Sequence, residues 1–132
     1  MTENAKFQAD VGDWADRALD QLLRVAKQST QDVIRDAQTP VAQGGNMPVD
    51  LGFLRNSIVS SIEGGASIGG EDAISLTISQ LQLGDVINFE WTADYAVPRH
   101  YMVGVGQGGG LWRDIAAAKW QDIVAKNARA VT

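Results

Sequence analysis

The sequence lacks cysteine, which excludes a disulfide framework, a thiol nucleophile and a zinc site with cysteine ligands. It also has only three prolines and no long apolar run, and its opening segment has no hydrophobic stretch typical of a signal peptide. We therefore expect a folded chain without a signal peptide, a membrane span or a membrane partner.

An excess of basic residues is missing as well. Eleven Lys and Arg stand against 16 Asp and Glu, which gives a net charge of −5. This balance excludes proteins whose main function is to bind nucleic acid through phosphate contacts. A length of 132 residues with 45% hydrophobic content predicts one compact domain spanning residues 1–132.

Groups suited to catalysis or metal binding are scarce. His100 is the only histidine, and no His-x-x-x-His or Asp-x-Asp-x-Asp spacing is present. His100 and Asp94 would need a serine to form a nucleophilic triad, but no Gly-x-Ser-x-Gly segment positions one. A lone histidine beside Arg99 and Tyr101 is more typical of a surface or an interface. The sequence predicts no metal, no cofactor and no enzymatic activity.

A long amphipathic helix is predicted over residues 10–37, where apolar residues recur at steps of three and four. Asp10 is the expected N-cap, and Thr39-Pro40 disfavours continuation at the far end. At about 1.5 Å per residue this helix is about 40 Å long, more than the width of a small domain. We expect one end to project or to pack on a neighbouring subunit.

The middle of the chain, residues 53–95, has the pattern of β-structure. A strand is predicted from about Ser57 to Glu63. Alternating apolar and polar residues predict two more strands, at 74–79 and 87–93, joined by a hairpin turn.

A glycine-rich stretch at 104–110 and a second helix over 111–130 follow the strands. This order predicts an α+β fold with an antiparallel sheet of three to four strands and the C-terminal helix packed on one sheet face. The glycines predict a flexible loop. The alternative is a small-ligand or nucleotide-binding module or enzyme that uses Gly104–Gly110 and His100, although the Gly-Lys-Ser/Thr ending of a P-loop is absent.

The four tryptophans lie on predicted apolar faces of helices and strands, so we interpret them as core anchors. A chain this small seldom buries four indoles, and tryptophan and tyrosine are enriched at protein interfaces. At least one tryptophan is therefore expected to face a partner. The candidate interface residues are Trp14, Trp91, Trp112, Tyr95, His100 and Tyr101.

The segment Pro-Val-Asp-Leu-Gly-Phe-Leu-Arg-Asn-Ser, residues 48–57, is the most informative one. Asp50 is expected to cap a tight turn and Gly52 to permit the bend. Leu54 is expected in the core, and Arg55 offers its guanidinium to a carboxylate. We interpret the segment as a structural turn. The motif positions are Pro48, Asp50, Gly52, Leu54, Arg55 and Ser57.

This segment resembles the Pro-Val-Asp-Thr-Gly-x-Leu-Arg-x-Ser motif of a family of small neck and tail-completion proteins of lambda-type long-tailed phages. Residues 92–96, Thr-Ala-Asp-Tyr-Ala, are similar to the Thr-x-x-Tyr-Ala of that family, and the closing helix around 116–124 also resembles it. The similar segments occur in the same order along most of the chain.

The resemblance implies a structural virion protein that forms a ring, usually a hexamer, at the head–tail junction. Its implied partners are further copies of itself and other phage proteins, namely the adaptor or head-closure protein, the tail terminator and the tail tube. The implied location is the virion neck, with the host cytoplasm during assembly. A tail terminator or head-closure protein of similar fold is the alternative within this class.

The acidic excess is concentrated in the β-rich middle of the chain. An acidic ring suits a channel for DNA, because repulsion keeps the passing duplex from sticking. DNA would then be cargo without sequence-specific binding. The candidate channel-lining residues are Glu63, Glu71, Asp72 and Asp85. The alternative is that these carboxylates only keep the surface soluble.

Overall fold

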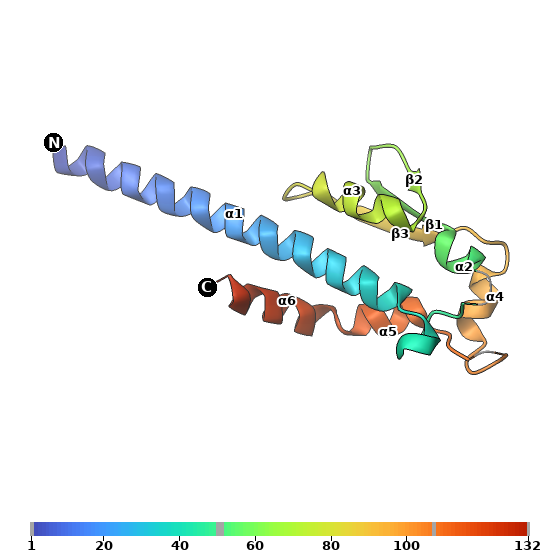
Figure 1. The fold of residues 1–132 in the computed structure, drawn as a ribbon. Helices are drawn as coiled ribbons and strands as arrows, with labels where there is room; N and C mark the ends of the chain where they lie inside the picture. Colours follow the sequence, from blue (N-terminus) through green and yellow to red (C-terminus); the bar gives the residue numbers. More distant parts are fainter. Residues whose placement is uncertain (1, 50–51, 107, 132) are drawn as a thin grey trace.

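The computed structural model describes residues 2–49, 52–106 and 108–131. One long helix, α1 (Thr2–Gln38), extends well beyond the rest of the chain, which gathers around its C-terminal half (Figure 1). The other elements follow in the order η1 (Val41–Gln43), α2 (Phe53–Asn56), β1 (Ile58–Ile62), β2 (Ile68–Gly69), η2 (Glu71–Ala73), α3 (Ile74–Ser79), β3 (Ile87–Trp91), α4 (Ala96–Tyr101), α5 (Trp112–Ala118) and α6 (Trp120–Ala130).

A small antiparallel sheet with the strand order β2-β1-β3 confirms the predicted α+β class. The strand predicted between Ser57 and Glu63 is present as β1, and the strand predicted at 87–93 is present as β3. Ile58 pairs with Trp91, and Ile62 pairs with Ile87. The register places Ile58 and Ile62 of β1 on the same sheet face as Ile87, Phe89 and Trp91 of β3, toward the helices, and leaves Val59 on the other face opposite Glu90.

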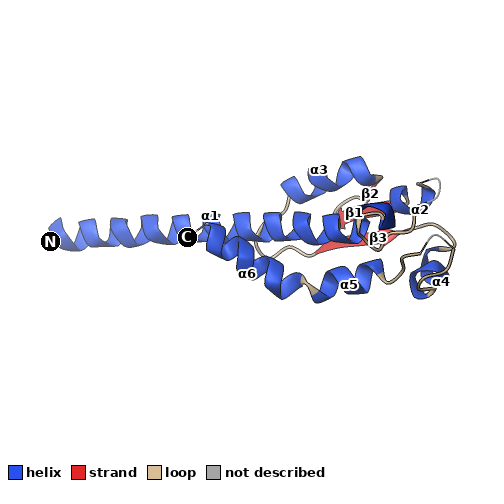
Figure 2. Cartoon of the chain, turned by 60° about the horizontal axis from the view of Figure 1, so that its bottom comes forward, coloured by secondary structure: helices blue, strands red, loops and turns tan. Residues whose placement is uncertain are grey.

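The core lies between this sheet face and the helices that cover it (Figure 2). Ile58 of β1 is fully buried, and Trp112 of α5 contacts Trp91 of β3 edge to face with ring centroids 5.9 Å apart. The buried apolar residues of this cluster are Ile34, Ala37, Met47, Leu54, Ile58, Ile74, Ile78, Ala96, Trp112 and Ala116.

Residues 74–79 form helix α3, so the prediction of a strand and of a hairpin turn after it is wrong. Ile74 and Ile78 fit both a strand period and a helical period. In the helix, Thr77 is buried together with Ile74 and Ile78, whereas Leu76 is exposed. Burial at steps of three and four residues is the pattern of a helix and not of a strand. Thr77 also donates or accepts a hydrogen bond with the buried Ser60 hydroxyl at 2.8 Å, which ties α3 to β1.

The C-terminal segment forms two helices instead of the single predicted one. They meet at Lys119, whose ammonium group lies 2.8 Å from the carboxylate of Asp36 on α1. Both helices pack along α1, and α5 also reaches the sheet through Trp112 (Figure 2). The change of direction at Lys119 lets one helix pair follow the surface of α1.

Helix α1 begins near the start of the chain, so Asp10 lies inside the helix and the prediction that it is the N-cap is wrong. The predicted end near residue 37 is confirmed, because α1 ends at Gln38. Its C-terminal half is held by burial of Val25, Ile34 and Ala37. The structure therefore contains a longer helix than the apolar stripe alone predicts.

Candidate functional site

The segment around residues 48–57 forms a corner of the fold that is held in place by side-chain contacts. Gly52 precedes α2 with a φ of 84°, a conformation that favours glycine, and Leu54 is buried, so both expectations are confirmed. The Arg55 guanidinium binds the carboxylate of Glu71 at 2.8 Å, which confirms the expected ion pair. Asp50 lies outside the described residues, so its predicted capping role stays a prediction.

Gln38, which the sequence did not single out, is the centre of this corner. It is buried at the end of α1, and its amide donates to the Arg55 carbonyl at 2.9 Å. Arg55 Nε donates back to the Gln38 carbonyl at 3.0 Å, and Trp91 Nε1 donates to the Gln38 side-chain oxygen at 2.8 Å. The motif thus joins α1, α2 and β3, and its residues serve the fold.

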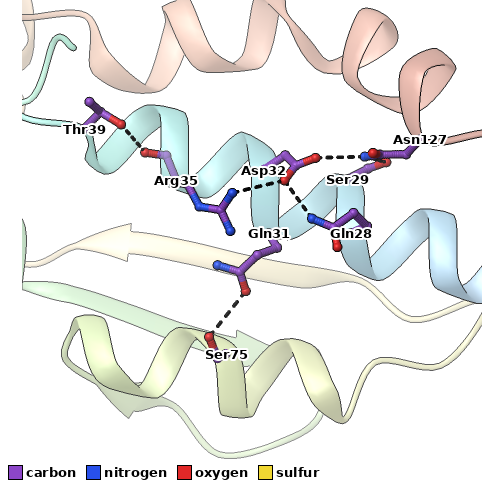
Figure 3. Close-up of polar contacts among 8 residues, drawn as sticks. All are labelled: Gln28, Ser29, Gln31, Asp32, Arg35, Thr39, Ser75 and Asn127. Carbon is purple, nitrogen blue, oxygen red and sulfur yellow. Dashed lines mark hydrogen bonds and ion pairs between the residues drawn. The ribbon is translucent and has the colours of Figure 1, made fainter. Parts of the chain in front are cut away.

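A second polar cluster joins α1 to α6 (Figure 3). The Asn127 amide donates to Ser29 Oγ at 3.1 Å and to Asp32 Oδ2 at 3.0 Å, and Gln28 donates to the other Asp32 oxygen at 2.8 Å. Burial by itself raises the pKa of Asp32, but these hydrogen bonds and the charge of Arg35 outweigh it and hold the pKa below its usual value. The cluster fixes how α6 lies on α1.

From residue 12 to residue 22, where the structure describes the side chains of α1, no such polar contact with the rest of the chain is present. Trp14, Leu19 and Leu22 are 66%, 53% and 55% exposed, so the interpretation of Trp14 as a core anchor is wrong. With Ala18 they form one uncharged side of the helix, because successive residues turn by about 100°. These four residues are called the α1 face below. Between residues 12 and 24 the charged residues lie on the opposite side of the helix, namely Asp13, Asp16, Arg17, Asp20 and Arg24.

A second exposed apolar surface lies at the far end of the molecule, where α4 runs into the glycine-rich stretch (Figure 1). Its five residues, called the α4 surface below, are Val97, Tyr101, Met102, Val103 and Val105, and they are 45–71% exposed. Sequence reasoning had named only Tyr101 among them. Helix α4 itself was missed, because Pro98 sits in its first turn, where proline costs no helical hydrogen bond.

Arg99 holds the glycine-rich stretch against α4. Its guanidinium donates to the carbonyls of Met102 at 2.7 Å, Val105 at 3.0 Å and Gly108 at 2.5 Å. The backbone N–H of Gly108 donates to the Val105 carbonyl, and that of Gly110 donates to the Asn46 carbonyl. In the described part of this stretch, carbonyl groups converge on a cation, whereas a phosphate cradle needs converging N–H groups.

His100 is buried, only 5% exposed, so the prediction that it lies at the surface or an interface is wrong. Its ring packs edge to face on Trp112 and on Tyr101, each at a centroid distance of 4.8 Å. Within the described residues neither ring nitrogen has a hydrogen-bond partner, and Nε2 lies 3.9 Å from the Asp114 carboxylate. Burial lowers the pKa of His100, and the charge of Arg113 lowers it further against the opposing effect of Asp114.

The remaining tryptophan and tyrosine candidates divide between core and surface. Trp112 is buried, which confirms a core anchor and makes its assignment to an interface wrong. Trp91 is half-buried and packs against the core, whereas Trp120 is 40% exposed and is no core anchor. Tyr95 is 48% exposed beside the α4 surface and stays an interface candidate.

The four candidate channel residues form two separate pairs. Glu63 and Asp85 lie at one end of β1, because the Glu63 N–H donates to the carbonyl of the residue after Asp85 at 2.8 Å. Glu71 and Asp72 lie in η2 at the other end of β1, and Glu71 is already paired with Arg55. The structure therefore does not gather the four carboxylates into one patch.

Within residues 2–49, 52–106 and 108–131, no group of three or more His, Asp or Glu side chains is placed to hold a metal ion. Within the same ranges, no helix is both long enough and apolar enough to span a membrane. Comparisons of the chain with models of known protein families, with curated proteins and with solved structures found no match.

Proposed function

We propose that this chain is a structural virion protein of a tailed phage, a subunit of a ring at the head–tail junction that joins tail to head and lines the DNA channel. The observation that carries this proposal is the free half of α1, with Trp14, Leu19 and Leu22 exposed on one uncharged side. A helix that projects from its own domain with such a side is suited to contact another chain.

The resemblance of the 48–57 segment to phage neck and tail-completion proteins supports the same proposal. The segment acts as a fold corner through Gly52, Leu54 and Arg55, and a subunit of a particle needs a rigid domain. The proposed role requires no catalytic group, metal or cofactor.

The surfaces of the chain also fit a ring. Closed cyclic assemblies use a heterologous interface, in which one surface of a subunit meets a different surface of the next. The α1 face and the α4 surface are two different exposed apolar surfaces, which supports an interface of this kind. The number of subunits is proposed to be six from the resemblance, and the other proposed partners are the adaptor or head-closure protein, the tail terminator and the tail tube. The net charge of −5 suits DNA as passing cargo.

A nonsense mutation in the gene of a phage that encodes this chain tests the function. We expect filled heads and separate tails by electron microscopy, with joined particles restored by the wild-type chain supplied in trans. Gold-labelled antibody is expected to mark the neck of intact particles. Joined, infectious particles that lack the protein would overturn the proposal. Tails of uncontrolled length in the mutant would instead identify the chain as a tail terminator, the alternative within this class.

A further inference from the structure

We propose that an extended segment of another protein adds to the sheet as a further strand, antiparallel to β3, and places an apolar side chain in the pocket between β3, α4 and α5. The partner segment has alternating apolar and polar residues, with a basic residue opposite Glu90. Strand addition of this kind goes beyond the proposed function and does not depend on it.

The outer edge of β3 has unpaired backbone groups. The Thr92 N–H donates to the Ser57 carbonyl at 3.1 Å, so in this register the even-numbered residues of β3 direct their N–H and C=O groups toward β1. The odd-numbered residues direct theirs away from β1, and these groups form no hydrogen bond within the described part of the chain. The odd-numbered residues are Ile87, Phe89 and Trp91. An extended peptide satisfies backbone groups that repeat at every second residue.

This edge also lacks most features that protect an edge strand. The sequence of β3, Ile-Asn-Phe-Glu-Trp, has no proline and no lysine, and all 5 of its residues pair with β1 in an unbroken register. The strand at the other edge, β2, has only 2 residues, which is too short to align a partner. Strand addition is therefore expected at β3.

A pocket of about 300 Å³ lies beside the β3 edge. Phe89 and Trp91 of β3, Val97 of α4 and Trp112 of α5 line it, and Figure 2 shows α5 on this side of the sheet. In an added strand, the residue opposite Trp91 has its side chain on the same sheet face as Trp91, toward the helices and the pocket. An aliphatic side chain there would cover Val97, which is 71% exposed.

The charges around the pocket indicate a basic partner residue. Arg113 is already paired with Asp114 at 2.9 Å, whereas Glu90 is exposed and has no ion pair among the described residues. Side chains alternate along a strand, so Glu90 and the residue opposite it share the outer sheet face. Opposite charges at such a position stabilise strand pairing, which favours lysine or arginine in the partner.

A second copy of this chain fits the edge less well. If two β3 strands paired, residues opposite each other would share a sheet face, so the helices of both copies would lie on the same side of one sheet. Helix α5 already bounds the space beside the β3 edge, through Trp112 and Arg113. The α5 helices of the two copies would crowd each other at the seam. A single extended segment brings no second helix layer.

The test uses a dye-labelled synthetic peptide, Thr-Val-Lys-Val-Lys-Val-Thr, whose valines face the helices and whose lysines face Glu90 and Asn88. We expect saturable binding by fluorescence anisotropy with a Kd below about 1 mM. Amide hydrogen exchange should slow at least about tenfold at Ile87, Phe89 and Trp91 when peptide is bound. The amides of Asn88 and Glu90 face β1, so their exchange should change little.

Two methylated peptides give a matched comparison. A methyl group on the backbone nitrogen of the central valine removes a hydrogen bond to β3 and should weaken binding at least about tenfold. The same group on the nitrogen of a lysine points away from β3 and should leave the affinity within about threefold.

Two protein variants test the side-chain contacts. Val97→Asp should weaken binding about tenfold, whereas Val103→Asp, on the same α4 surface but outside the pocket lining, should bind as wild type. Glu90→Lys should weaken binding about threefold, and a peptide with glutamate in place of its lysines should recover that loss. Circular dichroism melts close to that of wild type verify that each variant is folded.

Three results would overturn strand addition at β3 by another protein. The first is the absence of saturable binding up to about 1 mM peptide. The second is equal binding of the two methylated peptides, which would show that the backbone of β3 is not the contact. The third is protection of the Ile87, Phe89 and Trp91 amides in the free protein that rises with its concentration, which would assign the edge to a second copy. None of these results decides the virion role, which the nonsense mutation tests separately.

Discussion

Gln38 and Arg55 bind each other through a reciprocal pair of hydrogen bonds. The Gln38 side-chain amide donates to the Arg55 carbonyl at 2.9 Å, and the Arg55 side chain donates to the Gln38 carbonyl at 3.0 Å. These bonds satisfy the carbonyl at the end of α1 and the carbonyl within α2, both of which would otherwise need water. Because Arg55 also binds Glu71, the end of the long helix is tied to η2 beyond the first strand.

Replacing Gln38 by leucine should destabilise the domain by about 2–3 kcal/mol. The substitution leaves the Trp91 indole N–H and the Arg55 carbonyl without their partner in a buried corner, and an unpaired buried polar group costs about 1–3 kcal/mol. Urea unfolding measures the change. Trp91→Phe is the matched control, because in its background Gln38→Leu should cost less. Equal costs in both backgrounds would show that the Trp91 bond contributes nothing.

Gly45 and Gly52 are needed for different reasons: at Gly45 there is no space for a Cβ, whereas at Gly52 the backbone has a positive φ. A Cβ on Gly45 would lie 2.0 Å from the Thr39 carbonyl oxygen, whereas a Cβ on Gly52 meets nothing within 4 Å. Gly52→Ala should therefore cost only about 1 kcal/mol, for its φ of 84°. Gly45→Ala should cost at least about 3 kcal/mol, because backbone must move. Thermal melts rank the two, and Gly44→Ala, with an open site and a φ of 87°, should match Gly52→Ala.

The helix and strands that the sequence predicted best are those whose period is unambiguous over many residues. Residues 10–37 and 87–93 belong to this class, and both elements are present. At 74–79 six residues fit two periods equally well, and only packing against α1 and β1 decides for the helix. Local pattern cannot hold that information, since the deciding contacts come from distant segments.

Exposure of the candidate site was harder to predict than secondary structure. The apolar stripe of α1 continues unchanged from its covered part into its free part, so periodicity assigned Trp14 to the core. Whether the stripe is covered depends on the length of α6, which ends near the middle of α1. Similarly, the lone His100 is buried because Trp112 of α5 packs against its ring, a contact between elements that sequence spacing does not reveal.

The stability of the domain should fall as the pH decreases below about 6.5, and His100 should cause most of that fall. Its pKa in the folded state lies below 6.5, so the unfolded chain binds a proton that the folded chain does not. Stability is complete above this range and declines with acidification, by at most about 1.4 kcal/mol per pH unit for one proton. Urea unfolding at several pH values between 5 and 8 measures how the free energy of unfolding changes with pH.

His100→Phe is the variant that isolates this effect. Phenylalanine keeps the ring contacts with Trp112 and Tyr101, removes the two unpartnered nitrogens, and should raise stability at pH 7 by about 1 kcal/mol. Since His100 is the only histidine, the slope near pH 6 should disappear with it. A slope that persists in this variant would assign the pH dependence to another group.

Charge reversal at the two ends of β1 tests which part of the chain faces the DNA. Glu63 and Asp72 are both exposed, and they lie at opposite ends of β1, a strand about 16 Å long at about 3.3 Å per residue. If one end lines the channel, Lys at that end attracts the duplex and slows ejection, while Lys at the other end does not. Glu71 is left unchanged, because a lysine there would face Arg55 and damage the fold.

We expect Glu63→Lys and Asp72→Lys to assemble like wild type and to differ in the rate of DNA ejection from purified particles. Fluorescent dye binding to released DNA measures this rate. Glu63→Gln and Asp72→Asn are the matched controls, because they remove charge without reversing it and should slow ejection less. Ejection at the wild-type rate in both lysine variants would reject the channel role of these carboxylates and leave solubility as their function.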